Sequence, residues 1–236
     1  MDTIVAKITN DSLTDKKIYE QAGKILREGG LVAFPTETVY GLGADALDEK
    51  ASAKIYAAKG RPSDNPLIVH IADIEALYKL SCEVPDKALK LADKFWPGPL
   101  TMILKKSDIV PDSITGGLGT VAIRMPSHKV AAELIRTSGV YIAAPSANTS
   151  GKPSPTRASH VIKDLSGKID MIIEDDTVDI GVESTIIDLS EEVPTILRPG
   201  YITKEMFEEV IGGGRIDPAI TEGVKSGGVP KAPGMK

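Results

Sequence analysis

Short apolar runs and helically spaced apolar residues follow one another along this chain, a pattern typical of α/β proteins. The runs predict strands at residues 3–8, 31–34, 67–71, 100–104, 120–124, 141–144, 171–173, 185–189 and 195–197. Apolar residues three or four positions apart predict helices at residues 15–28, 48–60, 73–80, 85–95, 127–137, 203–211 and from 156 onward. Because strands and helices intermix without a strict βαβ rhythm, we expect an α/β sheet of mixed strand direction.

Polar residues and glycines locate the ends of several predicted helices. Asp48 is expected to cap a helix that Gly60 ends. Ser127 and Thr156 are expected to cap two later helices in the same way.

The pattern changes after Gly214, where periodic apolar residues stop. Residues 221–236 contain Gly, Pro and Lys in the proportions of a linker. We therefore predict one folded domain at residues 1–211 and a linker or tail at residues 212–236.

Composition excludes several broad classes of protein. Of 236 residues 42% are hydrophobic and 26% charged, and the net charge of -5 argues against a general nucleic-acid binder. Cys82 is the single cysteine, which excludes an intramolecular disulfide and a Cys-rich metal site. The N-terminus lacks the apolar segment of a signal peptide, and no run approaches about 18 apolar residues, so we expect a cytoplasmic location.

The tripeptide Lys59-Gly-Arg61 is the first candidate for binding an anion. Gly60 ends a helix and Pro62 biases Arg61 toward an extended conformation, so side chains two positions apart can point the same way. A guanidinium and an ammonium group together suit a phosphate or a carboxylate. Taken alone, the pair also fits two solvated charges after a helix.

Polar side chains also follow several predicted strands, at the ends where α/β sheets bind ligands. They are Thr36, Glu37, Thr38, Tyr40, Arg124, Ser146, Asn148, Glu183, Ser184 and Arg198. Turn chemistry or a solvated arginine could explain any one of them. Together they predict a polar, locally cationic cleft in an acidic protein. His70 ends an aliphatic strand, where a structural role is at least as consistent as a ligand contact.

Common catalytic motifs are missing from the sequence. It contains no Gly-x-x-x-x-Gly-Lys-Ser/Thr loop, no Gly-x-Gly-x-x-Gly after a strand and no Gly-x-Ser-x-Gly. His70, His128 and His160 are too dispersed for a zinc motif, so we expect no protein metal site.

Two distant tripeptides, Lys59-Gly-Arg61 and Ser146-Ala-Asn148, together match the Lys-x-Arg…Ser-x-Asn pattern of the YrdC/Sua5 family. Other segments that resemble this family are Phe34-Pro-Thr-Glu-Thr-Val-Tyr-Gly-Leu-Gly43, Asp64-Asn-Pro-Leu67, Trp96-Pro-Gly-Pro-Leu-Thr101, Gly181-Val-Glu-Ser-Thr185 and Leu197-Arg-Pro-Gly200. The resemblance covers roughly residues 12–211. Ala232-Pro-Gly-Met-Lys236 resembles the linker to a second, C-terminal domain in longer members, so we expect that this domain is absent here.

The resemblance implies a twisted open mixed sheet with a large concave cationic cleft. It also implies L-threonylcarbamoyladenylate synthase activity, a nucleotidyltransferase reaction that joins L-threonine, bicarbonate and ATP into threonylcarbamoyl-AMP and releases pyrophosphate. The product would pass to a tRNA threonylcarbamoyl-transferase complex, with only indirect or weak tRNA contact and no membrane. Mg²⁺ would arrive with ATP and bind mainly through the triphosphate.

The same resemblance implies site residues. Lys59 and Arg61 are the expected catalytic cations, which contact the phosphates and the carbamate. The expected ATP ligands are Lys59, Arg61, Ser63, Thr120, Ala144, Ser146, Asn148, Ser154 and Arg198. The expected threonine ligands are Thr36, Tyr40, His70, Arg124 and Ser184, with Arg124 pairing the carboxylate of threonine.

Two other functions fit the same features. The cationic cleft could belong to an RNA-binding module, although the acidic balance and sparse aromatic residues count against it. An O-carbamoyltransferase-like domain is the other, although such domains usually lie within much larger chains. Residues 231–236 and a continuation could also fold over the cleft as a gate.

Overall fold

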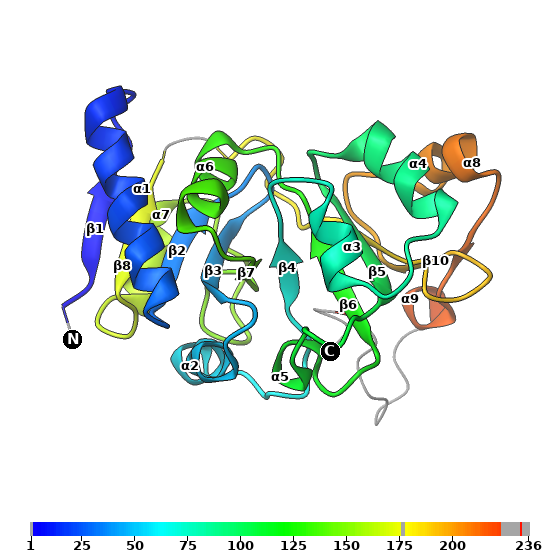
Figure 1. The fold of residues 1–236 in the computed structure, drawn as a ribbon, viewed down its shortest axis with the longest axis horizontal. Helices are drawn as coiled ribbons and strands as arrows, with labels where there is room; N and C mark the ends of the chain where they lie inside the picture. The colour runs from blue at the N-terminus through cyan, green and yellow to red at the C-terminus, as the bar shows by residue number, and fades with distance from the viewer. Residues whose placement is uncertain (1, 176–177, 223–231, 233–236) are drawn as a thin grey trace.

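The computed structural model describes residues 2–175, 178–222 and 232, and strands from its whole length form one mixed sheet (Figure 1). In spatial order the strands are β1 (Ile4–Lys7), β8 (Met171–Glu174), β2 (Val32–Pro35), β3 (Tyr40–Asp45), β7 (Ile142–Ala143), β4 (Ile68–His70), β6 (Thr120–Arg124), β5 (Leu100–Lys105), β9 (Thr185–Asp188), β10 (Thr195–Arg198) and β11 (Arg215–Ile216). Parallel pairs such as β4/β6 and β5/β9 alternate with antiparallel pairs such as β3/β7 and β5/β6. The expected mixed sheet is therefore confirmed.

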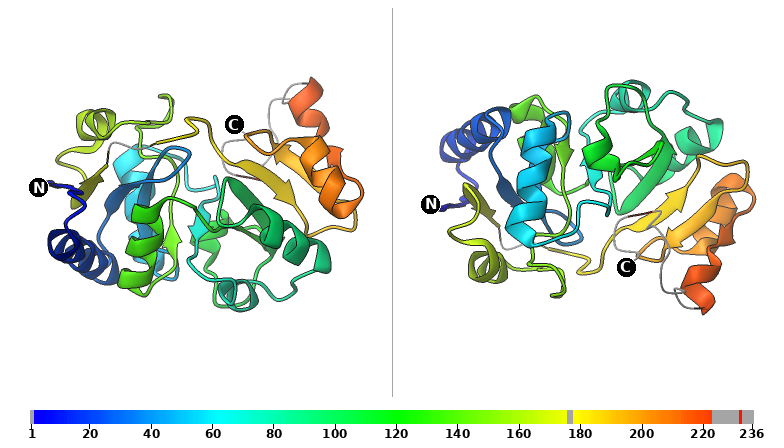
Figure 2. Two further views of the ribbon diagram at one scale, coloured as in Figure 1. Left: turned by 90° about the horizontal axis from the view of Figure 1, so that it is seen from above. Right: turned by 90° about the horizontal axis from the view of Figure 1, so that it is seen from below.

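Helices cover both faces of the sheet. They are α1 (Ser12–Arg27), α2 (Glu49–Lys59), α3 (Ala76–Leu80), α4 (Asp86–Phe95), α5 (Asp112–Thr115), α6 (Lys129–Ser138), α7 (Ala158–Leu165), α8 (Lys204–Ile211) and α9 (Pro218–Glu222). Helices α1 and α6 lie side by side on one face of β2 and β3, and α7 lies on the opposite face (Figure 2). In the described residues no helix is long and apolar enough to cross a membrane.

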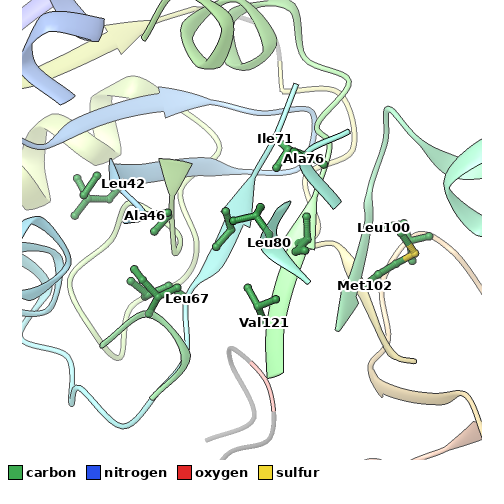
Figure 3. Packing of buried hydrophobic residues seen from close by; sticks show 14 of the residues in the cluster. Leu42, Ala46, Leu67, Ile71, Ala76, Leu80, Leu100, Met102 and Val121 are labelled. Carbon is green, nitrogen blue, oxygen red and sulfur yellow. The ribbon is translucent and has the colours of Figure 1, made fainter. Parts of the chain in front are cut away.

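Alternating side chains of the strands place the core on the two faces. Val32 and Phe34 pack with α1 and α6, whereas Ala33 packs with α7 on the other face. Ala33 belongs to the larger apolar cluster, which continues along the sheet through Leu67, Ile71, Leu80, Met102 and Val121, as Figure 3 shows.

One face of the central strands carries a smaller apolar cluster. Ile68, Ile103, Ala122, Ile186 and Leu197 form it, and Ala232 packs with them without exposure to solvent. The candidate site lies along this face, because His70 and Arg124 each follow a member of the cluster by two positions.

Strand β3 is the largest departure from the predicted elements, because neither a strand nor a helix was predicted between residues 35 and 47. Gly41-Leu-Gly43 has the composition of a turn, but the glycines serve packing across the sheet. A Cβ atom on Gly43 would lie 2.8 Å from Phe34 Cε1 and 2.7 Å from Ile142 Cγ2. The glycine thus makes room for the large Phe34 ring between neighbouring strands.

Several helix boundaries also differ from the prediction. Asp48 and Gly60 cap α2 as expected, with Gly60 in the left-handed conformation at φ 62. Helix α6 is capped by His128, whose side chain accepts from Val130 N, rather than by Ser127. Helix α7 is capped at Arg157 and begins at Ala158, one position later than a cap at Thr156 would require.

The folded part of the chain also extends beyond the boundary expected after Ile211. Strand β11 pairs in parallel with β10, and α9 follows it, so residues 215–222 belong to the fold. The start predicted for the linker is therefore too early. Most of the proposed gate at 231–236 lies outside the described residues, Ala232 excepted.

Candidate functional site

A pocket lies where the ends of β4 and β6 meet the loops before β3 and β9 and after β7. The parallel strands β4 and β6 end together, since His70 and Arg124 are register partners. An isolated bridge between Gly41 and Ser146 brings the loop after β7 to the same place. The residues around the pocket are Thr36, Thr38, Val39, Tyr40, Gly41, Arg61, Ile68, His70, Arg124, Ala144, Pro145, Ser146, Glu183, Ser184 and Arg198. Most of the predicted site residues therefore lie around one cavity, although they come from distant parts of the chain.

Arg124 is held beside the pocket by a buried carboxylate. Its Nη2 atom lies 2.7 Å from Glu37 Oε1, and both side chains are about 5% exposed or less. Its Nη1 donates to Thr38 Oγ1 at 2.9 Å. Burial acts to raise the pKa of Glu37, but the charge and hydrogen bond of Arg124 outweigh it and hold the pKa below its usual value. Glu37 is therefore a carboxylate at neutral pH, and it fixes the guanidinium that was predicted to bind threonine.

Arg198 is held in a second carboxylate pair at the pocket. Its Nη1 lies 2.6 Å from Glu183 Oε2, and its Nη2 donates to Ser184 Oγ at 3.0 Å. Ser154 Oγ also donates to Glu183, at 2.7 Å. Glu183 therefore joins two residues that were predicted to bind ATP, and Ser154 reaches the pocket only through it.

His70 contributes a neutral imidazole to the pocket. Burial, followed by the nearby charge of Arg124, lowers its pKa to about 3. Its Nδ1 lies 3.1 Å from the carbonyl oxygen of Ile68, which can only accept, so Nδ1 carries the proton. The other ring nitrogen is then an acceptor, which suits the amine of a ligand better than an anion.

The two residues of the Lys59-Gly-Arg61 tripeptide do not converge on one group as expected. Arg61 lines the pocket and donates from Nη2 to the carbonyl oxygen of Pro66 at 3.2 Å. Lys59 is 2% exposed, and its Nζ donates to the carbonyl oxygens of Ser146 and Asn148. The helix end directs the lysine beneath the loop after β7, because Gly60 turns the chain through the left-handed region between them.

Other predicted ligands lie away from the pocket. Ser63 is exposed. Thr120 begins strand β6 and Arg124 ends it, so Thr120 lies roughly 13 Å from Arg124 along the strand. Asn148 donates from Nδ2 to Thr149 O at 2.9 Å and Lys152 O at 2.8 Å, which shapes its own loop. Their roles toward ATP stay predictions.

The hydroxyl groups of two predicted threonine ligands form hydrogen bonds within the protein. Thr36 Oγ1 donates to Val39 O at 2.7 Å and so stabilises the turn before β3. The Tyr40 hydroxyl donates to Asp175 O at 2.7 Å. Both residues line the pocket, but these hydrogen bonds use their hydroxyl groups to stabilise the walls of the pocket.

Glu37, Thr38 and Glu183 lie in the segments predicted to form the cleft, but the sequence assigned them no role in holding a ligand or an arginine. Carboxylates repel anions, so Glu37 and Glu183 were not predicted to contact a ligand. The signal that could have found them is the need of each buried arginine for a counter-charge.

The sequence matches the Sua5_yciO_yrdC family, described as "Telomere recombination", over residues 24–200. The threonylcarbamoyl-AMP synthase of Pyrococcus abyssi is 57% identical over 234 residues, 99% of this chain and 68% of the relative. The Bacillus subtilis protein of the same name is 53% identical over 230 residues, 97% of this chain and 66% of the relative. The chain thus spans about two thirds of the length of these relatives.

Solved structures agree with the sequence matches. The structure of P. abyssi Sua5 complexed with L-threonine is 55% identical, covers 100% of this chain and 68% of that chain, and superposes with a TM-score of 0.93. E. coli YciO, 24% identical and covering 88% of this chain and all of that one, shares the fold with a TM-score of 0.74. The family match over residues 24–200, the high identities and this shared fold show that the chain belongs to the Sua5/YciO/YrdC family.

Proposed function

We propose that this chain forms threonylcarbamoyl-AMP and pyrophosphate from L-threonine, bicarbonate and ATP, as a step toward N6-threonylcarbamoyladenosine in tRNA. The observation that carries the proposal is the single pocket that joins Arg61, Arg124 and Arg198 with the neutral imidazole of His70. The names of the relatives, and the threonine complex of P. abyssi Sua5, support it.

The reaction brings anions together at every stage. Bicarbonate loses hydroxide to give CO₂, the amine of threonine attacks its carbon, and the proton released by the amine joins the hydroxide as water. A carbamate oxygen then attacks the α-phosphorus of ATP as pyrophosphate leaves. Guanidinium groups fixed in place before the reaction offset the repulsion between carbamate and phosphate. The reaction requires no protein nucleophile, so arginine and hydroxyl side chains around a pocket are sufficient to catalyse it.

The threonine end of the pocket would bind both ends of the amino acid. Arg124, held by Glu37, would pair with the carboxylate. The unprotonated nitrogen of His70 would accept from the amine. Nearby guanidinium groups lower the pKa of an ammonium group, which favours the uncharged amine that attacks carbon. Since the pKa of His70 is about 3, it acts here as an acceptor and not as the base.

The nucleotide end would hold the triphosphate. Arg61 and Arg198 line the pocket together with Ser146, and their guanidinium groups would bind phosphate oxygens. Mg²⁺ would enter with the triphosphate and supply charge neutralisation there. Among the described residues no group of three or more His, Cys, Asp or Glu side chains could hold a metal ion by itself. A tRNA threonylcarbamoyl-transferase complex would consume the product.

Pyrophosphate release tests the proposal directly. The chain is incubated with ATP, Mg²⁺ and bicarbonate, with and without L-threonine, and the adenylate is identified by mass spectrometry. We expect pyrophosphate and a threonylcarbamoyl adenylate only when all substrates are present. Release that ignores threonine, or tight salt-sensitive binding of tRNA without any response to ATP, would contradict it.

Glu183→Gln is expected to tighten ATP binding. The Glu183 carboxylate occupies Arg198 and Ser154, and its charge repels an incoming phosphate. Glutamine keeps an oxygen for the Arg198 guanidinium and can donate from its NH₂ to the Ser154 hydroxyl oxygen, but it removes the charge. The Kd for ATP should therefore fall about threefold to tenfold, roughly 0.7–1.4 kcal/mol. Isothermal titration calorimetry measures the change. Glu191→Gln, which neutralises an exposed carboxylate away from the pocket, is the matched control. Weaker binding by Glu183→Gln would mean that the carboxylate supports the nucleotide and does not compete with it.

A further inference from the structure

Lys59 is an ammonium group buried under a backbone loop. It is the last residue of α2, and its Nζ donates to Ser146 O and to Asn148 O, the latter at 2.6 Å. The side chain is 2% exposed and does not line the pocket that Arg61 lines. A phosphate in that pocket would meet the loop before it met this ammonium group.

The loop that Lys59 holds forms one wall of the pocket. Ala144, Pro145 and Ser146 line the cavity, and the chain then turns away toward α7. Backbone bonds anchor the loop on both sides, from Ala147 N to Tyr40 O at 2.8 Å and from Ser150 N to Lys59 O at 2.9 Å. In the same loop the ammonium group binds the carbonyl oxygens of Ser146 and Asn148, one on each side of Ala147.

We propose that Lys59 is a positioning residue, which sets the backbone of residues 146–148 for the nucleotide instead of contacting phosphate. The proposal rests on the function proposed above for its substrate, but the geometry that it describes exists without ligand. Hydrogen bonds from a charged donor are roughly twice as strong as neutral ones, so these two reinforce the bonds that Pro145 O, Ala147 N and Thr149 N already form.

The charge on Lys59 responds to pH near neutrality. Burial, followed by the charge of Arg61, lowers its pKa from 10.5 to about 7, while Glu183 and Asp164 oppose the shift. A neutral amine is a weaker donor, so the loop should loosen as pH rises through 7. The stability of the whole fold should instead increase as pH rises. The unfolded chain binds more protons at this lysine between pH 7 and 10.5, so this group makes folding more favourable as pH rises.

Amide hydrogen exchange of the ligand-free protein tests the proposal. Lys59→Met should lower the protection factors of the Ala147 and Ser150 amides about tenfold or more, while amides of β5 keep theirs. Lys50→Met, which removes an exposed lysine from the same helix, should leave both amides unchanged. In the same comparison the Kd for ATP should rise about tenfold in Lys59→Met alone.

Two outcomes would overturn the proposal. Unchanged protection at Ala147 and Ser150 in Lys59→Met, together with weaker ATP binding, would make Lys59 a direct ligand. Wild-type protection of these amides that does not fall between pH 6 and 8.5, relative to β5, would also contradict it, and this measurement needs no variant. Pyrophosphate release by the wild-type chain decides the proposed function separately.

Discussion

Arg124→Met is expected to abolish threonine-dependent pyrophosphate release. The guanidinium is the proposed partner of the threonine carboxylate, and losing one side of a buried charge pair costs about 2–5 kcal/mol. The Kd for threonine should therefore rise at least about 30-fold. Binding of ATP should stay within about threefold, because the proposed phosphate ligands are Arg61 and Arg198, not Arg124. Calorimetric titration with each substrate separates the two effects.

The same substitution is also expected to destabilise the fold. It leaves Glu37, 5% exposed at its side chain, without the cation 2.7 Å away. An uncompensated buried charge of this kind costs about 3–5 kcal/mol, which urea unfolding would measure. Combining Arg124→Met with Glu37→Gln removes the charge and should restore most of the stability without restoring threonine binding. A double variant that recovers threonine binding would show that Arg124 acts only as a structural partner of Glu37.

The sheet could be predicted from the sequence because its strands are short aliphatic runs. Val32, Val69 and Ile123 are buried, so their segments carry the signal of a strand without any knowledge of the fold. Strand β3 gave no such signal. Its glycines are dictated by the Phe34 ring on the neighbouring strand, and that contact exists only once the sheet has formed.

The candidate site was predictable to the level of residue type but not of direction. The spacing of Arg124, Arg198 and His70 at strand ends predicted a shared edge, and the structure places all three around one pocket. The direction of Lys59 depends on backbone carbonyls 87 and 89 positions further along the chain. No local pattern encodes such a contact. The sequence around Lys59 is therefore the same whether the lysine lies beneath a loop or binds a phosphate.

Gly200→Ala is expected to damage both the fold and the nucleotide side of the pocket. A Cβ atom there would lie 2.6 Å from Glu183 O, 2.6 Å from Thr185 N and 2.9 Å from Ser184 C. These are backbone atoms of the segment that holds Arg198, so the methyl group can be accommodated only by moving Arg198 and Ser184 apart. We expect a loss of about 1–3 kcal/mol in the free energy of unfolding and at least about tenfold weaker ATP binding.

Gly119→Ala is the matched control for this substitution. No atom lies within 4 Å of a Cβ on Gly119, and its backbone is outside the left-handed region, so stability should change by less than about 1 kcal/mol. Urea unfolding and ATP titration of the two variants then separate a clash from the general effect of adding a methyl group. Should Gly200→Ala unfold and bind ATP like Gly119→Ala, the close approach of residue 200 to residues 183–185 would not be what fixes Arg198. The expected contrast instead connects Gly200 to the position of Arg198, the proposed ligand of the triphosphate, because only a residue without a side chain lets the two loops approach this closely.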